Sequence, residues 1–498
     1  MSTETGRAGR TSQHTRRRAL KSVFQSVGAG IFGSALADLV GSEFGASARL
    51  RAAETPGSGH SAPGVYDLSP KRPHFQPKAK AVIHLFMNGG PSQMDLFDPK
   101  EMLTRHHGKP YFGKIAGEVE SPSQAGALMK SPFTFQRHGK CGMWVSELFP
   151  HLARHVDDIA LIRSLYTVNL THEPAIYKIQ SGRQLPGFPT LGAWVAYGLG
   201  SENRDLPGYV VLDDPKGLPV NGVENWQAGF LPPVYQGTRF RSEGSPVLNL
   251  NPEVEQPSGV LEVERELIAR LDRIHRRARP GYPSLGARLS NYELAARMQL
   301  SASDALDLSM ESKKTQELYG LDDKVTESYG RRCLIARRLV ERGVRFVQLY
   351  INGQIWDHHS NIEGGLRSAC ARTDKPIAGL LEDLKQRGLL DSTVVVWGGE
   401  FGRLPISQTG RNKVGRDHNK NAAVTWFAGA GIQPGTTYGA TDDLSLKAVE
   451  DRVSVQDWHA TILHLLGMDH EKLFFERDGL EEKLTAVFDT QIVEGILS

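Results

Sequence analysis

Short apolar segments that alternate with helical patterns constrain the fold of this chain more than any other feature of its sequence. Such segments are typical of buried β-strands when they are too short for helices and end at Gly, Asn or polar residues. They occur at 81–87, 159–163, 209–212, 344–351, 393–397 and 422–427. Helical patterns lie between them, at 147–155, 174–181, 191–199, 363–384 and 455–466. Because strands separated by helices pair in parallel, we predict an α/β protein with a large, mostly parallel sheet covered on both faces.

The segment 259–342 differs from the rest in being charged and rich in helical patterns, which are clearest at 260–277, 292–299 and 331–342. We expect this segment to be a helical insertion between two halves of one domain that spans 81–475. Residues 476–498 then form a C-terminal tail.

The N-terminus has the layout of an export signal. A basic stretch with the pair Arg16-Arg17 precedes an uncharged, Gly- and Ala-rich stretch from Ser22 to Ala37, which is too short for a stable membrane span. The arginine pair is typical of a twin-arginine signal. We therefore expect residues 1–48 to direct the protein to the periplasm or the cell exterior, with 49–80 as a linker. A plain basic tail is the alternative.

The charge balance and the cysteines exclude several classes of protein. Residues 1–48 hold six basic and three acidic residues, so the remaining 450 residues carry 53 of each sign. A neutral body argues against nucleic-acid binding, which needs a cluster of excess Lys and Arg. Cys141, Cys333 and Cys370 are too scattered for a disulfide scaffold or a Cys-ligated zinc site.

Polar residues follow several of the predicted strands, and in open α/β sheets ligands bind beyond the carboxyl ends of the strands. An Asp-x-His pattern, Asp357 and His359, follows 344–351; Glu400 follows 393–397, and Asp417-His418 comes next along the chain. These side chains offer nitrogen and oxygen atoms that can bind a divalent metal. Zinc is the metal that we expect, and calcium and manganese are the alternatives. A loop hydrogen-bond network at Asp357 and His359, and an ion pair between Glu400 and Arg403, are the other interpretations.

Two further places carry candidate residues. After 81–87 come Asn88, which could be a metal ligand, an oxyanion donor or a turn residue, and Ser92, a candidate substrate contact. After 159–163 come Thr171 and His172, at the start of a predicted helix whose N-terminus favours a phosphoryl or sulfuryl group. Thr171 is equally suited to be an ordinary N-cap.

Several segments together resemble the bacterial domain-of-unknown-function 1501 family. They are 87–95, 292–298, 331–347, 399–403, 415–418 and 457–467, so the resemblance covers about residues 80–475. Membership implies the alkaline phosphatase-like superfamily, which includes sulfatases and uses one or two metals in a three-layer α/β/α sandwich. An exported precursor is also typical of that family.

The resemblance extends to particular residues of the superfamily's metal site. Asp357 and His359 look like the Asp/His pair of one metal, Glu400 like the Asp after a late strand, and His418 like the last His ligand. Asn88 stands where the superfamily has its first metal-binding Asp.

The stretch from His172 to Arg183 resembles the one that follows the sulfatase nucleophile. No Cys, however, occupies the Cys-x-Pro-x-Arg pattern that sulfatases convert to formylglycine. The nucleophile is therefore open between Thr171 and a metal-bound water, with His172 as a ligand or proton donor.

These observations predict an exported metal-dependent hydrolase of phosphate or sulfate esters, acting on a small anionic ester or on a sulfated or phosphorylated polymer. Arg403 or Arg183 is expected to hold the substrate's oxygens. The alternative is a secreted binding protein without catalytic activity that keeps the fold and a structural metal.

Overall fold

The computed structural model describes residues 66–244, 247, 259–279, 283–409 and 413–498. The expected export signal at 1–48 and most of the expected linker at 49–80 lie outside the described residues. By its internal contacts the chain divides into two units, one made of Met1–Tyr66 and Leu248–Gln299 and the other of Asp67–Val247 and Leu300–Ser498. Residues 300–342, which we expected to belong to the insertion, are thus part of the larger unit.

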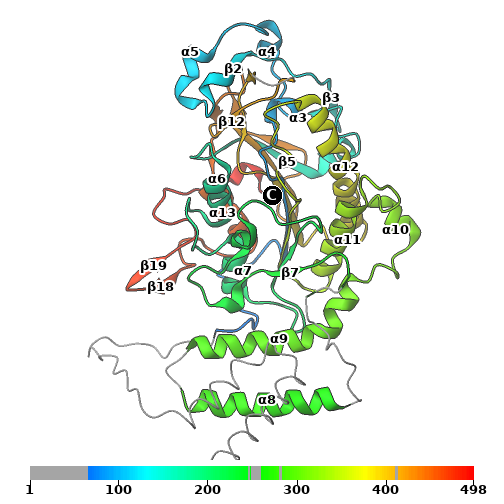
Figure 1. Cartoon of the computed structure of the whole chain (residues 1–498), viewed down its shortest axis with the longest axis vertical. Helices are drawn as coiled ribbons and strands as arrows, with labels where there is room; N and C mark the ends of the chain where they lie inside the picture. Colours follow the sequence, from blue (N-terminus) through cyan, green and yellow to red (C-terminus); the bar gives the residue numbers. More distant parts are fainter. Residues whose placement is uncertain (1–65, 245–246, 248–258, 280–282, 410–412) are drawn as a thin grey trace, which may run out of the picture. The chain divides into compact units, whose positions relative to one another are not determined.

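A nine-stranded sheet forms the centre of the larger unit (Figure 1). Its strand order is β14-β5-β13-β9-β1-β8-β6-β7, with β17 also paired to β5. β13 (Ala423–Gly429) runs antiparallel to both of its neighbours, β5 (Ile159–Tyr166) and β9 (Thr393–Gly398), and the other pairs are parallel. The predicted α/β class with a large, mostly parallel sheet is confirmed.

The central strands are buried along their whole length because helices cover both faces of the sheet. They are β1 (Ala81–Phe86), β8 (Phe346–Leu349), β6 (Tyr209–Leu212) and β9. The remaining strands of the sheet are β7 (Thr238–Phe240), β14 (Thr436–Tyr438) and β17 (Val453–Ser454).

Figure 1 shows α6 (His172–Ser181), α7 (Leu191–Leu199) and α13 (Val455–Leu465) on one side of the sheet. On the other side lie α11 (Glu327–Glu341) and α12 (Ile362–Gln386), which pack on each other. α13 begins at a capping box in which the Ser454 hydroxyl accepts from the Asp457 N–H and the Asp457 carboxylate accepts from the Ser454 N–H.

Our prediction of an α-helix at 147–155 is wrong. A 3₁₀ helix occupies Leu152–Asp158 instead. Pro150 interrupts the expected helix, because a proline lacks the N–H that an α-helix interior needs and disfavours a helical residue before it. Asp374 then accepts hydrogen bonds from the N–H groups of His151 and Leu152, where the shorter helix begins.

Smaller elements beyond the sheet build the surroundings of the site. β10 (Gly402–Arg403) pairs with β12 (His418–Asn419). β2 (Ala125–Leu128) pairs with β11 (Ile406–Gln408), which ties residues 125–128 to the segment after β9. The other elements are α3 (Gln93–Leu96), α4 (Glu101–Arg105), α5 (Phe112–Ile115), β3 (Phe135–His138), β4 (Met143–Ser146), α8 (Val260–Arg277), α9 (Pro283–Leu306), α10 (Lys313–Leu318), β15 (Ala440–Thr441), β16 (Ala448–Glu450), β18 (Phe475–Arg477) and β19 (Leu480–Glu482).

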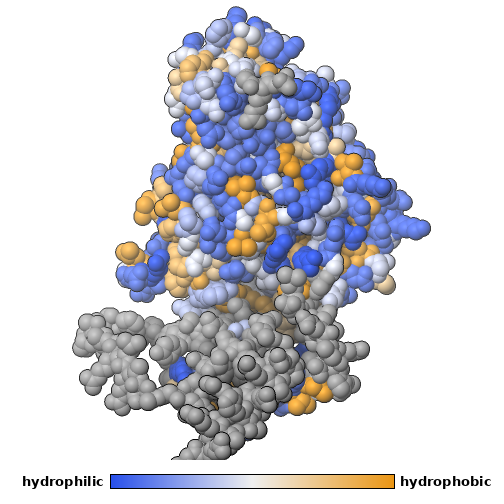
Figure 2. Space-filling view, viewed as in Figure 1, coloured by the Kyte–Doolittle hydropathy of each residue, from blue (hydrophilic) through white to orange (hydrophobic). Residues whose placement is uncertain are grey.

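On the face seen in Figure 2, the coloured surface is mostly hydrophilic, with hydrophobic residues in small, separate patches. Among the described helices, none combines the length and the apolar character needed to cross a membrane. Cys141, Cys333 and Cys370 are all free thiols.

Candidate metal site

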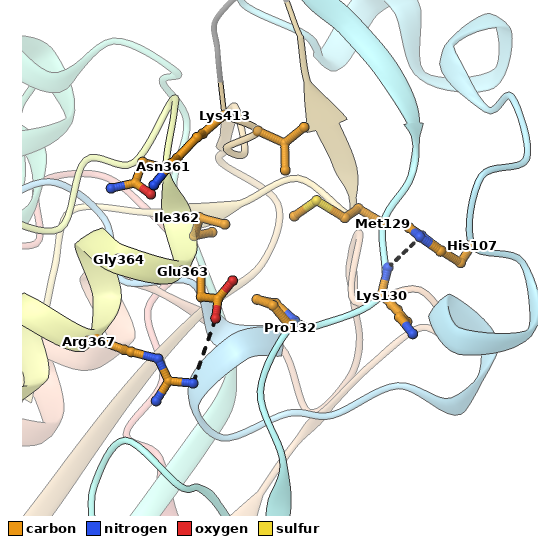
Figure 3. Close-up of a pocket in the computed structure, with 11 residues that line it drawn as sticks. His107, Met129, Lys130, Pro132, Asn361, Ile362, Glu363, Gly364, Arg367 and Lys413 are labelled. Carbon is orange, nitrogen blue, oxygen red and sulfur yellow. Dashed lines mark hydrogen bonds and ion pairs between the residues drawn. The ribbon is translucent and has the colours of Figure 1, made fainter.

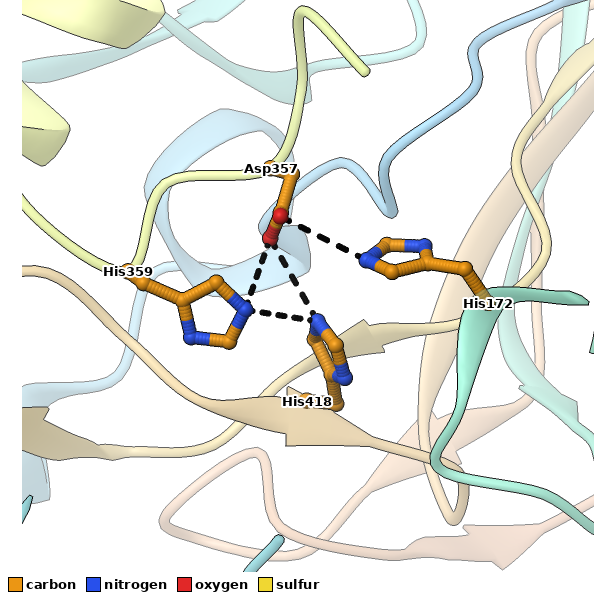
Figure 4. A group of neighbouring side chains, drawn as sticks. All are labelled: His172, Asp357, His359 and His418. Atoms are coloured by element: carbon orange, nitrogen blue, oxygen red, sulfur yellow. Dashed lines mark hydrogen bonds and ion pairs between the residues drawn. The ribbon is translucent and has the colours of Figure 1, made fainter. Parts of the chain in front are cut away.

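Four side chains converge beyond the carboxyl ends of the strands, and we call them the histidine cluster: His172, Asp357, His359 and His418 (Figure 4). One ligand atom from each lies within 4.8 Å of the others. Asp357 Oδ1 is 3.0 Å from His359 Nε2 and 3.3 Å from His418 Nε2, and Asp357 Oδ2 is 3.5 Å from His172 Nε2. The two Nε2 atoms of His359 and His418 are 2.9 Å apart.

The sheet topology explains why residues so distant in sequence meet. β5, β9, β1 and β8 all run in the same direction, so their carboxyl ends share one edge of the sheet. His172 is the first residue of α6, which follows β5, and the loop after β8 carries Asp357 and His359. His418 opens β12, where it pairs with Arg403 of β10.

Each imidazole of the cluster is held at Nδ1 by an acceptor. His172 Nδ1 is 2.6 Å from Glu400 Oε1, and His359 Nδ1 is 2.5 Å from Gln408 Oε1. The amide of Gln408 is oriented in turn, since its Nε2 donates to Gln124 Oε1. An acceptor at this position places the proton of a neutral imidazole on Nδ1 and leaves a lone pair on Nε2.

His418 follows the same rule. Its Nδ1 is 2.6 Å from the carbonyl oxygen of Leu170 and 2.6 Å from Glu120 Oε2. All three imidazoles therefore direct Nε2 at Asp357.

When the imidazoles are neutral, this arrangement brings acceptors together without donors between them. Lone pairs on the Nε2 atoms of His359 and His418 repel each other at 2.9 Å unless a proton or a cation lies between them. The Nε2 of His172 is buried and has no hydrogen-bond partner among the described residues. Three imidazole nitrogens and one carboxylate are a donor set that zinc accepts, so the cluster fits a divalent metal.

The charges around the cluster shift the pKa of several groups. Burial lowers the pKa of His172, but its contacts with Asp357 and Glu400 outweigh burial and raise the pKa to about 9. Burial also opposes the charge of Asp357, yet the Arg403 guanidinium and the three imidazoles hold its pKa far below the usual range. The cluster thus keeps its carboxylate ionised at any ordinary pH.

A second group of possible ligands shares two histidines with the first. It consists of Glu120, His359, Asp417 and His418. Its carboxylates lie on the Nδ1 sides of the rings, with Glu120 Oε2 at 2.6 Å from His418 and Asp417 Oδ1 at 3.8 Å from His359. Since a neutral imidazole offers one lone pair, these carboxylates suit the role of acceptors for Nδ1–H while Nε2 faces an ion.

Glu400, which we predicted as a metal ligand, contacts His172 of the cluster, and Asn88, the other residue predicted as a ligand, follows β1. Glu400 is buried and accepts from the N–H of Gly89 as well as facing His172 Nδ1, so it positions an imidazole. Asn88 is buried and donates from Nδ2 to the carbonyl oxygen of Ile351, while its Oδ1 has no partner among the described residues.

Arg403 contacts Asp357 and is buried, with 1% of its surface exposed. Its guanidinium donates to Asp357 Oδ1 at 2.7 Å and to the carbonyl oxygens of Gly90 and Arg416. It also donates to the carbonyl oxygen of Gly89. Enclosed in this way, Arg403 orients Asp357 and has no open face for the oxygens of a substrate.

The remaining predicted residues occupy different places. Arg183 lies at the far end of α6, about 16 Å from His172 at the helical rise, and pairs with Glu482. Ser92 is buried and donates to Asp95. Thr171 is the exposed N-cap residue of α6, and its side chain makes no cap hydrogen bond.

The sequence analysis missed Glu120, Gln408 and the carbonyl of Leu170. Glu120 and Gln408 come from segments outside the main sheet, and no spacing in the sequence connects them to His418 or His359. A main-chain carbonyl is present at every residue, so nothing in the sequence distinguishes that of Leu170.

Comparison with known proteins identifies the family. Residues 79–497 match the family described as protein of unknown function, DUF1501, and because the match spans most of the chain, the protein belongs to this family. The predicted membership is confirmed. No curated protein matches the sequence.

Among solved structures, the chain is similar to a lipoteichoic acid synthase from Listeria monocytogenes, with 9% identity and a TM-score of 0.36 over 80% of this chain and 74% of the other. A sulfatase from Pseudoalteromonas sp. has 13% identity and a TM-score of 0.34 over 79% and 68%. A phosphonate monoester hydrolase from Silicibacter pomeroyi has 12% identity and a TM-score of 0.33 over 78% and 73%. Likenesses at this level assign no activity to the chain.

Proposed function

We propose that the protein is a metal-dependent hydrolase of phosphate or sulfate esters and that the histidine cluster holds its divalent ion. The observation that carries the proposal is the common direction of the three Nε2 atoms toward Asp357, each imidazole being held at Nδ1 by a separate acceptor. A network of hydrogen bonds alone would place a donor opposite each acceptor. Three fixed lone pairs beside a carboxylate instead suit a cation.

An anionic substrate is favoured by the helix that carries His172. α6 has ten residues, and its N-terminus, with Thr171 as the N-cap, lies beside the cluster. The first N–H groups of a helix and its positive dipole end attract an anion. A phosphoryl or sulfuryl ester meets both this helix terminus and the cation.

A divalent ion in the cluster supplies Lewis acidity that polarises a phosphoryl or sulfuryl oxygen and lowers the pKa of water. The chain's own residues do the rest of the positioning. Glu400 fixes the ring of His172, and Arg403 fixes the carboxylate of Asp357. Both are almost fully buried, so neither exchanges its partner for water during a reaction.

Thr171 has a hydroxyl next to the cluster in sequence and open to solvent, which makes it the candidate nucleophile of the chain. Thr171→Ala then abolishes turnover while metal content and fold persist. Full activity of this variant would mean that water attacks the ester and that Thr171 is only an N-cap.

One observation favours a second function, a binding protein with a structural metal. Structural zinc sites have four protein ligands, whereas catalytic ones keep a position open, and the histidine cluster offers four. In that case the protein binds metal and turns over no ester.

The two functions are separated by activity assays on the purified protein loaded with zinc, manganese or calcium. We expect hydrolysis of an aryl phosphate, an aryl phosphodiester or an aryl sulfate that stops on addition of a chelator and is lost in His359→Ala. His358→Ala is the matched control, because this neighbouring histidine is outside the cluster. Retention of one metal per chain with no turnover of any of the three esters would support the binding protein.

We also propose export by the twin-arginine route, supported by Arg16, Arg17 and the uncharged stretch after them. Replacement of both arginines by lysine leaves the precursor in the cytoplasm, as judged by cell fractionation. Undiminished export of this variant would exclude the route.

A further inference from the structure

A surface cavity of about 660 Å³ opens beside the loops that carry the metal ligands (Figure 3). Cationic side chains and apolar ones share its lining, and one carboxylate, that of Glu363, is among them. We call it the cationic cavity, and it is lined by His107, Met129, Lys130, Pro132, Asn361, Ile362, Glu363, Gly364, Arg367, Lys413 and Val414.

Positive charge predominates in this cavity. The lining holds three cationic side chains, those of Lys130, Lys413 and Arg367, and a single carboxylate, that of Glu363, which is 3.8 Å from the Arg367 guanidinium. Arg367 is further balanced by Glu147 at 2.8 Å, outside the lining. The ammonium groups of the two lysines have no carboxylate partner among the described residues, so they supply the unbalanced charge of the cavity.

The walls of the cavity continue directly from the candidate metal site. Asn361 follows His359 by two residues, which places their Cα atoms within about 7.6 Å of each other. The other wall leads from Lys413 to His418 through Gly415, where an added Cβ would lie only 2.1 Å from the main chain of His359. The two walls therefore meet in tight contact at His359 itself.

Two other features of the cavity indicate the kind of ligand. The N-terminus of the 25-residue helix α12 reaches the lining, and the side chain of its N-cap residue, Asn361, makes no cap hydrogen bond. Apolar side chains, those of Met129, Pro132, Ile362 and Val414, form part of the surface between the charges. Cations with apolar surface between them suit an organic backbone that carries anionic groups better than a free inorganic ion.

We propose that the cationic cavity binds a second sulfate or phosphate group of the substrate while a first group is at the histidine cluster. This inference rests on the proposed ester hydrolase, and it narrows the substrate to an organic molecule with more than one anionic group. Lys130 and Lys413 are then specificity-determining residues that act on binding and leave the reacting ester untouched.

The first test measures binding without turnover. Sucrose octasulfate and inositol hexakisphosphate are titrated by calorimetry into the His359→Ala chain, in which the cluster no longer holds its metal. We expect the further double substitution Lys130→Gln/Lys413→Gln to weaken binding of at least one probe about tenfold, since charge-assisted contacts are lost. The probe that shows the larger loss distinguishes sulfate from phosphate.

The matched control removes two lysines elsewhere, Lys140→Gln/Lys313→Gln, which changes the net charge equally at exposed positions outside the cavity. We expect less than a twofold effect from this control. Equal weakening by both double variants would overturn the inference, because it would show attraction by net charge alone.

The second test uses the metal-loaded protein and any ester that it hydrolyses. For an ester with several anionic groups, the cavity double variant should raise KM about tenfold with kcat unchanged, whereas KM for a simple aryl monoester stays within twofold. Unchanged KM for both kinds of ester would overturn the inference and leave the proposed hydrolase intact. Lysine-dependent binding in a protein that hydrolyses no ester would overturn both the hydrolase and the role in substrate selection.

Discussion

Two clusters of charged side chains include residues of the segment after β11, one cluster fully buried and the other partly buried, and they differ in how their charges are balanced. In the first, which we call the arginine cluster, Arg416 Nε is 2.7 Å from Asp95 Oδ2, and Ser92 donates to the same carboxylate. Arg416 also donates to two main-chain carbonyls. The second is the histidine cluster, whose member His418 is only two residues away.

The difference lies in how donors and acceptors are matched. In the arginine cluster each carboxylate oxygen meets a guanidinium nitrogen, so the chain neutralises its own charge and nothing is missing. In the histidine cluster with neutral rings, the lone pairs of two Nε2 atoms face each other at 2.9 Å, and the third Nε2 lies 3.5 Å from Asp357 Oδ2 without a hydrogen bond among the described residues. The charges of the arginine cluster are balanced by the chain's own side chains, whereas the lone pairs of the histidine cluster suit a bound cation.

The largest effect is expected from removing a member of the histidine cluster. His418→Ala should reduce metal content from about one ion per chain to nearly none, because one of four donors and its oriented lone pair are lost. Metal analysis of the purified protein measures this. His358→Ala should keep its metal, and loss of metal from both variants to the same extent would argue against a site at these four residues.

Breaking the arginine cluster should destabilise the fold and leave the metal in place. Asp95→Asn leaves the buried guanidinium of Arg416 without a negative partner. We expect this to lower the free energy of unfolding by about 3–5 kcal/mol. Denaturant unfolding of the metal-loaded protein measures this cost. The double variant Asp95→Asn/Arg416→Met should lose less than the sum of the two single variants, and strict additivity would show that the pair is not coupled.

A smaller effect is expected at Glu400, which holds Nδ1 of His172. Glu400→Gln keeps an acceptor for His172 Nδ1–H but removes the negative charge, so zinc affinity should fall about 10–100-fold. Competition with a zinc-binding dye measures the affinity. Glu173→Gln, at an exposed carboxylate next to His172, is the control, and an equal loss there would point to general charge.

The smallest effect is a change in how stability depends on pH. In the metal-free chain the pKa of His172 is raised to about 9, whereas an unfolded histidine has a pKa near 6.5. The folded chain therefore binds an extra proton between these values. Its contribution to stability is fully present below about pH 6.5 and is lost as the pH rises through about 9.

Melting temperatures measured in chelator from pH 6 to pH 9.5 should show this decline as a few degrees. With zinc the contribution reverses, because the metal needs the neutral imidazole and binds more tightly as the pH rises. Identical pH profiles with and without zinc would mean that His172 does not contact the ion.

The sequence by itself determined the sheet and the edge at which the site lies. Short apolar runs such as 81–87 and 393–397 can be buried only as strands between helices, and parallel strands bring their carboxyl ends to one edge. The polar residues after them, Asp357, His359 and His418 among them, were therefore expected together, and the structure places them together. This much follows from local patterns, because strand direction sets where each loop begins.

Only the tertiary structure decided what each polar side chain does at that edge. Glu400 turns to His172 Nδ1, Arg403 is enclosed by main-chain carbonyls, and Glu120 and Gln408 arrive from segments outside the sheet. These roles depend on distances of a few ångströms between loops that are far apart in sequence. A residue type specifies which contacts a side chain can make, but the packing of the loops selects which partner lies within reach.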